Sequence, residues 1–191
     1  MTYNKDKDQL KSLSLLSGIA PPTCYSILYP CDCPNNLNCF KDMESGLAYA
    51  KENNKPIMID FTGYACVNCR KMEEHVWPKK RIFDILNDDY VLISLYVDDK
   101  KDLPKQLEVP RVQGSGKRKL RNYGHKWAHM QEKYFRTNTQ PYYALLSPDM
   151  DLLNQPVGYT PEVEEYEKFL KCGLEAFKEI DGKKTLIGSS E

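Results

Sequence analysis

The motif Cys66-Val67-Asn68-Cys69 places two cysteines at the spacing that proteins use for reversible thiol–disulfide chemistry. It follows a short apolar run, residues 56–62, and opens a helical pattern, so it lies where a buried strand meets a helix. Unsatisfied N–H groups at a helix N-terminus stabilise a thiolate. We therefore predict that Cys66, the more exposed thiol, is the nucleophile and that Cys69 resolves the mixed disulfide. Half of a zinc site and a pair of inert thiols are the alternatives.

Two carboxyl groups are placed to act on this dithiol. Asp60 lies inside the apolar run, where burial raises the pKa of a carboxyl and suits it to move a proton to or from a thiol. Glu73 follows Cys69 by one helical turn, so its charge would also raise the pKa of the thiols. The alternatives are a satisfied buried acid without a role for Asp60 and an ordinary exposed helix residue for Glu73.

The elements around the motif alternate between helices and strands, which is typical of an α/β protein. Strands are predicted over residues 56–62, 90–97, 141–146 and 152–157, the last two as an antiparallel hairpin. Helices are predicted after the capping residue Asp42, over residues 67–86 with a kink at Pro78, near residues 124–134, and after Pro161.

The chain divides into an extension, one domain and a tail. Residues 1–39 contain several prolines and predict an irregular, Cys-rich extension. Residues 40–180 carry the alternating pattern and predict the domain, with an insertion at residues 99–139, and residues 181–191 predict a flexible tail.

The insertion combines turn residues with basic side chains. Gly114-Ser115-Gly116 predicts a hairpin or a loop tip. Residues 111–126 contain six basic residues and no acidic one, which predicts a solvated loop or, as the second interpretation, a docking patch for an acidic partner.

Residues 39–177 resemble the thioredoxin superfamily, and most closely the C-terminal periplasmic domain of the thiol:disulfide interchange (DsbD) and cytochrome c biogenesis family. The matching segments are residues 55–61, 66–73 and 140–143. The resemblance implies a thioredoxin fold, with a central mixed sheet, a C-terminal antiparallel hairpin and helices on both faces. It also implies no organic cofactor.

The resemblance assigns a role to each site residue. Cys66 is the nucleophile and Cys69 the resolving cysteine, Asp60 and Glu73 are the acids, and Pro141 is a cis proline that faces the pair. Two positions depart from the family pattern: Ala65 stands where a tryptophan is common, and Gln140 replaces the threonine or valine that often precedes the cis proline.

The function implied is that of a protein-disulfide reductase in a periplasmic electron relay. In the family, this domain accepts electrons from a membrane-embedded cysteine pair and passes them to partner redox domains and protein disulfide substrates, which supports cytochrome c maturation. The alternatives are a disulfide oxidase or isomerase, and a thioredoxin-like binding module without catalysis.

Composition excludes several other functions. The 27 basic and 27 acidic residues balance, so nothing in the net charge points to nucleic-acid binding. No apolar stretch approaches the roughly 18 to 20 residues that span a bilayer, and residues 10–20 are too short and too polar for a signal peptide. We expect a chain that does not itself insert into a membrane.

The remaining cysteines and two histidines have other interpretations. Cys24, Cys31, Cys33 and Cys39 could form disulfides in an oxidising compartment or bind zinc, and their spacing favours one disulfide, Cys33–Cys39. Cys172 is predicted to be a buried, inert thiol. His125 and His129 are interpreted as a helix-surface pair, because no third metal ligand accompanies them.

Overall fold

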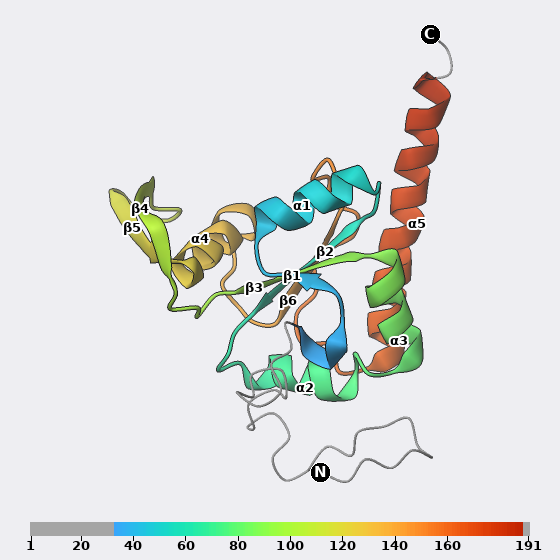
Figure 1. Ribbon diagram of the computed structural model, residues 1–191, viewed down its shortest axis with the longest axis horizontal. Coiled ribbons are helices and arrows are strands. Elements are labelled where there is room, and N and C mark those ends of the chain that lie inside the picture. Colours follow the sequence, from blue (N-terminus) through green and yellow to red (C-terminus); the bar gives the residue numbers. More distant parts are fainter. Residues whose placement is uncertain (1–32, 189–191) are drawn as a thin grey trace.

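The computed structural model describes residues 33–188, with side chains described through residue 182. A four-stranded mixed sheet forms its centre, in the order β1-β3-β2-β6 (Figure 1). The strands are β1 (Cys39–Phe40), β2 (Ile57–Thr62), β3 (Val91–Tyr96) and β6 (Tyr142–Leu146). β1, β3 and β2 are parallel, whereas β6 runs antiparallel to β2. The carboxyl ends of β2 and β3 therefore meet at one edge of the sheet.

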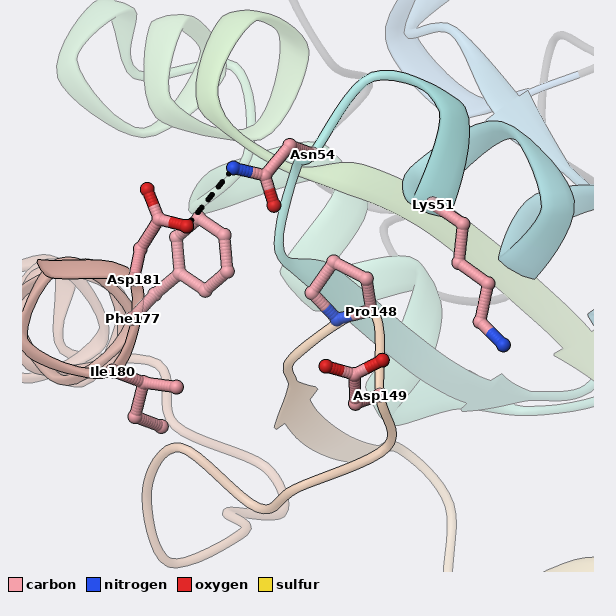
Figure 2. Close-up of a pocket in the computed structure, with 7 residues that line it drawn as sticks. All are labelled: Lys51, Asn54, Pro148, Asp149, Phe177, Ile180 and Asp181. Atoms are coloured by element: carbon pink, nitrogen blue, oxygen red, sulfur yellow. Dashed lines mark hydrogen bonds between the residues drawn. The ribbon is translucent and has the colours of Figure 1, made fainter. Parts of the chain in front are cut away.

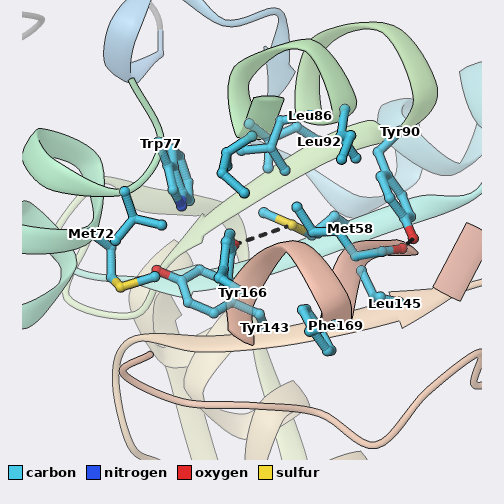
Figure 3. Close-up of a cluster of buried hydrophobic side chains, with 14 of the residues drawn as sticks. Met58, Met72, Trp77, Leu86, Tyr90, Leu92, Tyr143, Leu145, Tyr166 and Phe169 are labelled. Atoms are coloured by element: carbon cyan, nitrogen blue, oxygen red, sulfur yellow. Dashed lines mark hydrogen bonds between the residues drawn. The ribbon is translucent and has the colours of Figure 1, made fainter. Parts of the chain in front are cut away.

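Helices cover both faces of this sheet. They are α1 (Met43–Glu52), α2 (Val67–His75), α3 (Lys80–Asp84), α4 (Tyr123–Phe135) and α5 (Val163–Gly188), with a π-helical turn at Ile85–Asp89. One face packs against α2, α3 and α5 around Met58, Leu92 and Trp77 (Figure 3). The other face packs against α1 and α4, with Ile59, Ile93 and Trp127 in its core. Every residue of β2 and β3 is buried, as the continuous apolar runs predict.

The predicted insertion, residues 99–139, forms a separate two-stranded hairpin followed by α4. β4 (Asp102–Pro110) and β5 (Lys117–Asn122) pair antiparallel, with Gly114 and Gly116 at positive φ in the connecting turn. The hairpin projects from the body of the protein beside α4 (Figure 1). The predicted hairpin in the insertion is confirmed.

Two features differ from the sequence prediction. Residues 152–157 contact β6 through two isolated bridges, Tyr143↔Val157 and Leu146↔Leu152, rather than through a continuous strand. Pro156 has no N–H to donate between these bridges, which explains the interruption. Cys39 begins β1 and so belongs to the sheet, although the domain was predicted to start at residue 40.

The ends of the chain are described in part. α5 continues to Gly188, so the helix includes residues 181–188 of the predicted tail, residues 181–191. Cys33 and Cys39 form a disulfide with a Cα–Cα distance of 6.0 Å, which confirms the predicted pairing. Cys24 and Cys31 lie outside the described residues. Across the part of the chain that the structure describes, no helix is both long and apolar enough to cross a membrane.

Candidate active site

The two cysteines of the C-x-x-C motif lie at the N-terminus of α2. They form a disulfide in this structure, with Cα atoms 5.3 Å apart. Cys66 is the N-cap residue, and its Sγ accepts a hydrogen bond from the Cys69 amide at 3.2 Å. Cys66 is partly exposed, whereas Cys69 is 1% exposed. One sulfur is therefore accessible to a partner and the other is not, as the sequence predicts.

Asp98, which lies just after the end of β3, holds the loop that leads from β2 to Cys66. The backbone amides of Tyr64 and Ala65 donate to the two carboxylate oxygens of Asp98, at 2.8 and 3.0 Å. Asp98 follows β3, which pairs with β2, so the carboxyl ends of the two strands are joined through this loop. The contact fixes the backbone immediately before the nucleophile candidate.

Asp60 lies beneath this site on β2. Its side chain is on the face that packs against α2, because Met58 on the same strand contributes to that core. It is 1% exposed, and its Oδ2 accepts from the Ser94 hydroxyl at 3.2 Å, while its Oδ1 has no hydrogen-bond partner. Burial raises the pKa of Asp60 to about 7, against the opposing effects of Arg70 and the Ser94 hydroxyl.

Glu73 is buried on α2, so the interpretation as an ordinary exposed helix residue is wrong. One of its carboxylate oxygens lies 2.7 Å from the guanidinium of Arg70, which is itself 3% exposed and donates to Thr62 and to the Gly63 carbonyl. Burial nevertheless raises the pKa of Glu73 to about 8, and the charge of Asp60 adds to the increase.

Asp60, Arg70 and Glu73 form one buried cluster beside the dithiol. It contains one permanent positive charge and two carboxyl groups that each oppose ionisation of the other. Arg70 balances one negative charge, so near neutral pH the second carboxyl retains a proton. The two carboxyl groups therefore share one proton near neutral pH, and the pair titrates as a unit.

Pro141 directly precedes β6 and follows a cis peptide bond from Gln140, as the family resemblance implies. In the register of β6, Tyr142 lies opposite Phe61. Pro141 is therefore next to the end of β2, at the sheet edge from which the loop to Cys66 departs. Hydrogen bonds connect the preceding loop to α4. The side-chain amide of the buried Gln131 donates to the Thr139 carbonyl and accepts from the side-chain amide of Gln140.

Sequence reasoning missed Arg70, Asp98 and Gln131 as parts of the site. Arg70 stands three residues before Glu73, a spacing at which opposite charges pair on a helix, and this signal was available. Asp98 lies two residues after the end of a buried strand, and the carboxyl ends of strands are a common place for polar site residues in α/β sheets. Nothing in the sequence indicates the contact of Gln131 with the loop.

The second disulfide lies close to the same helix. Asn35, inside the segment closed by Cys33 and Cys39, donates to the Glu73 carbonyl at 2.8 Å. Leu37 in this segment joins the core beneath α2. The disulfide therefore fixes a segment that covers α2 rather than contributing to the dithiol.

The remaining candidates lie apart from the dithiol. Cys172 is a free cysteine of intermediate exposure, not a buried one, because it lies at the margin of the apolar face of α5. His125 and His129 are on α4, and among the described residues no group of three or more metal-ligating side chains occurs.

A cavity of about 290 Å³ between α1, α5 and residues 148–149 lies at the opposite end of the sheet (Figure 2). Its lining contains no cysteine.

Comparisons with known proteins agree with this geometry. A family model described as thioredoxin-like matches residues 38–148, more than half of the chain, and the protein therefore belongs to the thioredoxin-like family. Its fold is similar to that of a solved structure described as a DsbH oxidoreductase, with a TM-score of 0.50, 14% identity, and coverage of 78% of this chain and 93% of that one.

Two further solved structures are more distant. A disulphide isomerase from Xylella fastidiosa Temecula1 has a TM-score of 0.40 and 13% identity over 76% of this chain and 98% of that one. A thioredoxin-fold protein from Helicobacter pylori has a TM-score of 0.40 and 13% identity over 67% of this chain and 87% of that one. A comparison with curated protein sequences finds no match.

Proposed function

We propose that this protein is a thiol–disulfide oxidoreductase that reduces protein disulfides through Cys66 and Cys69. The observation that carries the proposal is the asymmetric pair at the N-terminus of α2, with Cys66 partly exposed, Cys69 buried and Cα atoms 5.3 Å apart. The pair can close a disulfide in place, and the helix N-terminus stabilises the thiolate of the exposed member.

The reaction proceeds by two exchanges. The Cys66 thiolate attacks one sulfur of the substrate disulfide, forms a mixed disulfide and releases the other sulfur as a thiolate, which takes up a proton. The Cys69 thiol then loses its proton and attacks the Cys66 sulfur, which releases the second substrate thiol. Two electrons and two protons pass from the dithiol to the substrate, and the protein is left in the disulfide form seen here.

The buried carboxyl groups supply the proton transfer that the second exchange needs. Cys69 has no direct access to solvent, so a protein group must accept its proton. Asp60 is suited to this role because its pKa of about 7 lets it gain and lose a proton near neutral pH. Glu73 and Arg70 set the charge beside Asp60. Pro141, at the same sheet edge, would contact the substrate chain while the mixed disulfide exists.

We further propose that the protein acts in a periplasmic electron relay of the DsbD type that supports cytochrome c biogenesis. Its dithiol would accept electrons from a membrane-embedded cysteine pair and pass them to partner redox domains. The support is the sequence resemblance, whose segments 55–61, 66–73 and 140–143 correspond to β2, the start of α2 and the start of β6. An oxidising role is the alternative, and the reduction potential distinguishes the two.

Single-turnover exchange tests the proposed function. The reduced protein is mixed with a peptide that contains one disulfide, and the products are alkylated and weighed by mass spectrometry. We expect reduction of the peptide by the wild type, none by Cys66→Ser, and accumulation of a peptide mixed disulfide at Cys66 in Cys69→Ser. An equal rate for wild type and Cys66→Ser would contradict the proposal.

A further inference from the structure

The β4–β5 hairpin is large for what it contributes to the core of the domain. Of its strand residues, only Leu120 is buried, at 2% exposure, whereas β4 is exposed along almost its whole length. A two-stranded hairpin gains little stability by itself in water. Core packing therefore does not account for this arm.

The two faces of β5 differ in character. Arg118, Leu120 and Asn122 face α4, where Arg118 lies 3.6 Å from Glu132 and Asn122 caps the helix. Because side chains alternate along a strand, Lys117, Lys119 and Arg121 share the opposite, exposed face. We call these three residues the basic face.

The basic face has little acidic compensation. Lys117 and Lys119 share one carboxylate, that of Glu108 on β4, at the long distances of 3.9 and 3.8 Å. Arg121 makes no ion pair within the described residues. The hairpin, residues 102–122, contains six basic residues and two acidic ones in a chain of zero net charge, so positive charge is concentrated on this arm.

The base of the arm is attached to the segment that holds the loop before Cys66. At its base, the amide of Gly124 donates to the Asp99 carbonyl, next to Asp98, whose carboxylate holds the loop before Cys66. A Cβ on Gly124 would lie 2.6 Å from the Val97 carbonyl oxygen, so the helix and the end of β3 are in close contact. The base of the arm is therefore anchored at the same strand end that holds the loop before Cys66.

We propose that the basic face binds an extended acidic segment of the protein whose disulfide Cys66 attacks. Alternate side chains on a strand lie about 6.5 Å apart, which is also the spacing of alternate side chains on an extended peptide. A segment with carboxylates at every second position would meet Lys117, Lys119 and Arg121 in turn. Complementary charge raises the rate of encounter and fixes orientation.

This inference rests on the proposed function, and the experiment separates the two. Reduced wild-type protein is mixed with two disulfide peptides that differ only in a flanking segment, which carries glutamate at alternate positions in one and glutamine in the other. The uncharged bis(2-hydroxyethyl) disulfide serves as a substrate without a segment. The test variant is Lys117→Gln/Lys119→Gln/Arg121→Gln. The control, Lys79→Gln/Lys168→Gln/Lys178→Gln, removes three exposed charges elsewhere.

We expect the wild type and the control to reduce the acidic peptide about tenfold faster than the neutral one at low salt, with the ratio falling toward one as salt is raised. The test variant should lose the preference and keep its rate with the small disulfide. An equal preference in the test variant, or none in the wild type, would overturn the inference. Failure of the wild type to reduce the small disulfide would instead overturn the proposed function.

Other occupants of the basic face give different results. Salt-sensitive dimerisation of the wild type in gel filtration, lost in the test variant, would assign the face to a second copy of the chain. Co-sedimentation with phosphatidylglycerol vesicles, also lost in the test variant, would assign it to an anionic membrane. Either result, without a peptide preference, contradicts the binding of an acidic segment.

Discussion

Asp60 should make the stability of the domain depend on pH. Its pKa rises from 3.8 to about 7 on burial, so the folded state binds the proton more tightly than the unfolded state does. Its contribution to stability is therefore complete below about pH 4 and is lost as pH rises to about 7. Asp60→Asn should remove this loss and flatten the dependence of the free energy of unfolding on pH, with the effect of Glu73 remaining.

Chemical denaturation of the disulfide form at about pH 5 and about pH 8 measures this effect. Asp60→Asn should gain stability relative to the wild type at the higher pH. Parallel pH curves for the two proteins would show that Asp60 titrates at the same pH in the folded and unfolded states. In single-turnover exchange near pH 7, the same variant should react about a hundredfold more slowly, because Cys69 loses its proton acceptor.

Asp98 should act as a positioning residue for Cys66. Asp98→Ala removes the acceptor of both the Tyr64 and the Ala65 amide, so the loop before the nucleophile is no longer fixed. We expect the exchange rate to fall about tenfold. Asp98→Asn, which keeps one acceptor oxygen, should recover part of the rate, and Asp102→Ala on the exposed part of β4 serves as the control. If Asp98→Ala unfolds the domain without a selective loss of rate, the role is structural only.

The site residues differ in how far their roles could be predicted from sequence. Asp60 could be singled out because a carboxyl within an apolar strand has few structural explanations. The burial of Glu73 could not be predicted, because it depends on its ion pair with Arg70, which occupies the same space between α2 and the sheet. The contacts of Asp98 depend on two strands ending side by side, which only the register determines.

Gly124 joins the hairpin base to the end of β3, and a methyl group there should be costly. Its Cβ would meet backbone atoms of Val97 and Asp99 at 2.6 to 2.8 Å, and backbone atoms cannot rotate away. We expect Gly124→Ala to lower the free energy of unfolding by about 1 to 3 kcal/mol. Gly182→Ala, with no atom within 4 Å, should be neutral or slightly stabilising. Denaturant titration compares the two variants, and an equal effect of both would contradict the close contact.

At the level of elements, the sequence predicts best where burial is complete. β2 and β3 are buried throughout, and helix α1 begins after the predicted cap Asp42, whose carboxylate accepts from the Ser45 amide. Residues 152–157 have strand-like composition, but Pro156 leaves only isolated bridges. β1 could not be predicted, because a two-residue strand has no periodicity to read.

The Cys33–Cys39 disulfide should stabilise the whole molecule without taking part in exchange. It closes a loop of six residues, for which the entropic model gives about 2 kcal/mol. Cys33→Ser/Cys39→Ser should therefore unfold at lower denaturant concentration, by about that free energy, and should still reduce a disulfide peptide. Loss of peptide reduction by the folded double variant would show that this pair belongs to the redox path.

At the scale of the whole molecule, total charge conceals its distribution. The chain is neutral overall, yet the basic residues of β5 gather on one exposed face because strand geometry separates Lys117 and Lys119 from Arg118. The run of basic residues was visible in the sequence. The attachment of the hairpin base to the end of β3 was not visible, because it depends on the tertiary contacts of Gly124 with Val97 and Asp99.

The equilibrium reduction potential of the Cys66–Cys69 couple, measured against a dithiothreitol or glutathione series, tests the proposed reductase most directly. Cys66→Ser is the control for signal from the other cysteines. We predict a reversible two-electron couple near the value of about −270 mV that is found for thioredoxin. A value near about −180 or about −120 mV would place the protein with isomerases or oxidases instead. The absence of any reversible couple would contradict redox catalysis by this site.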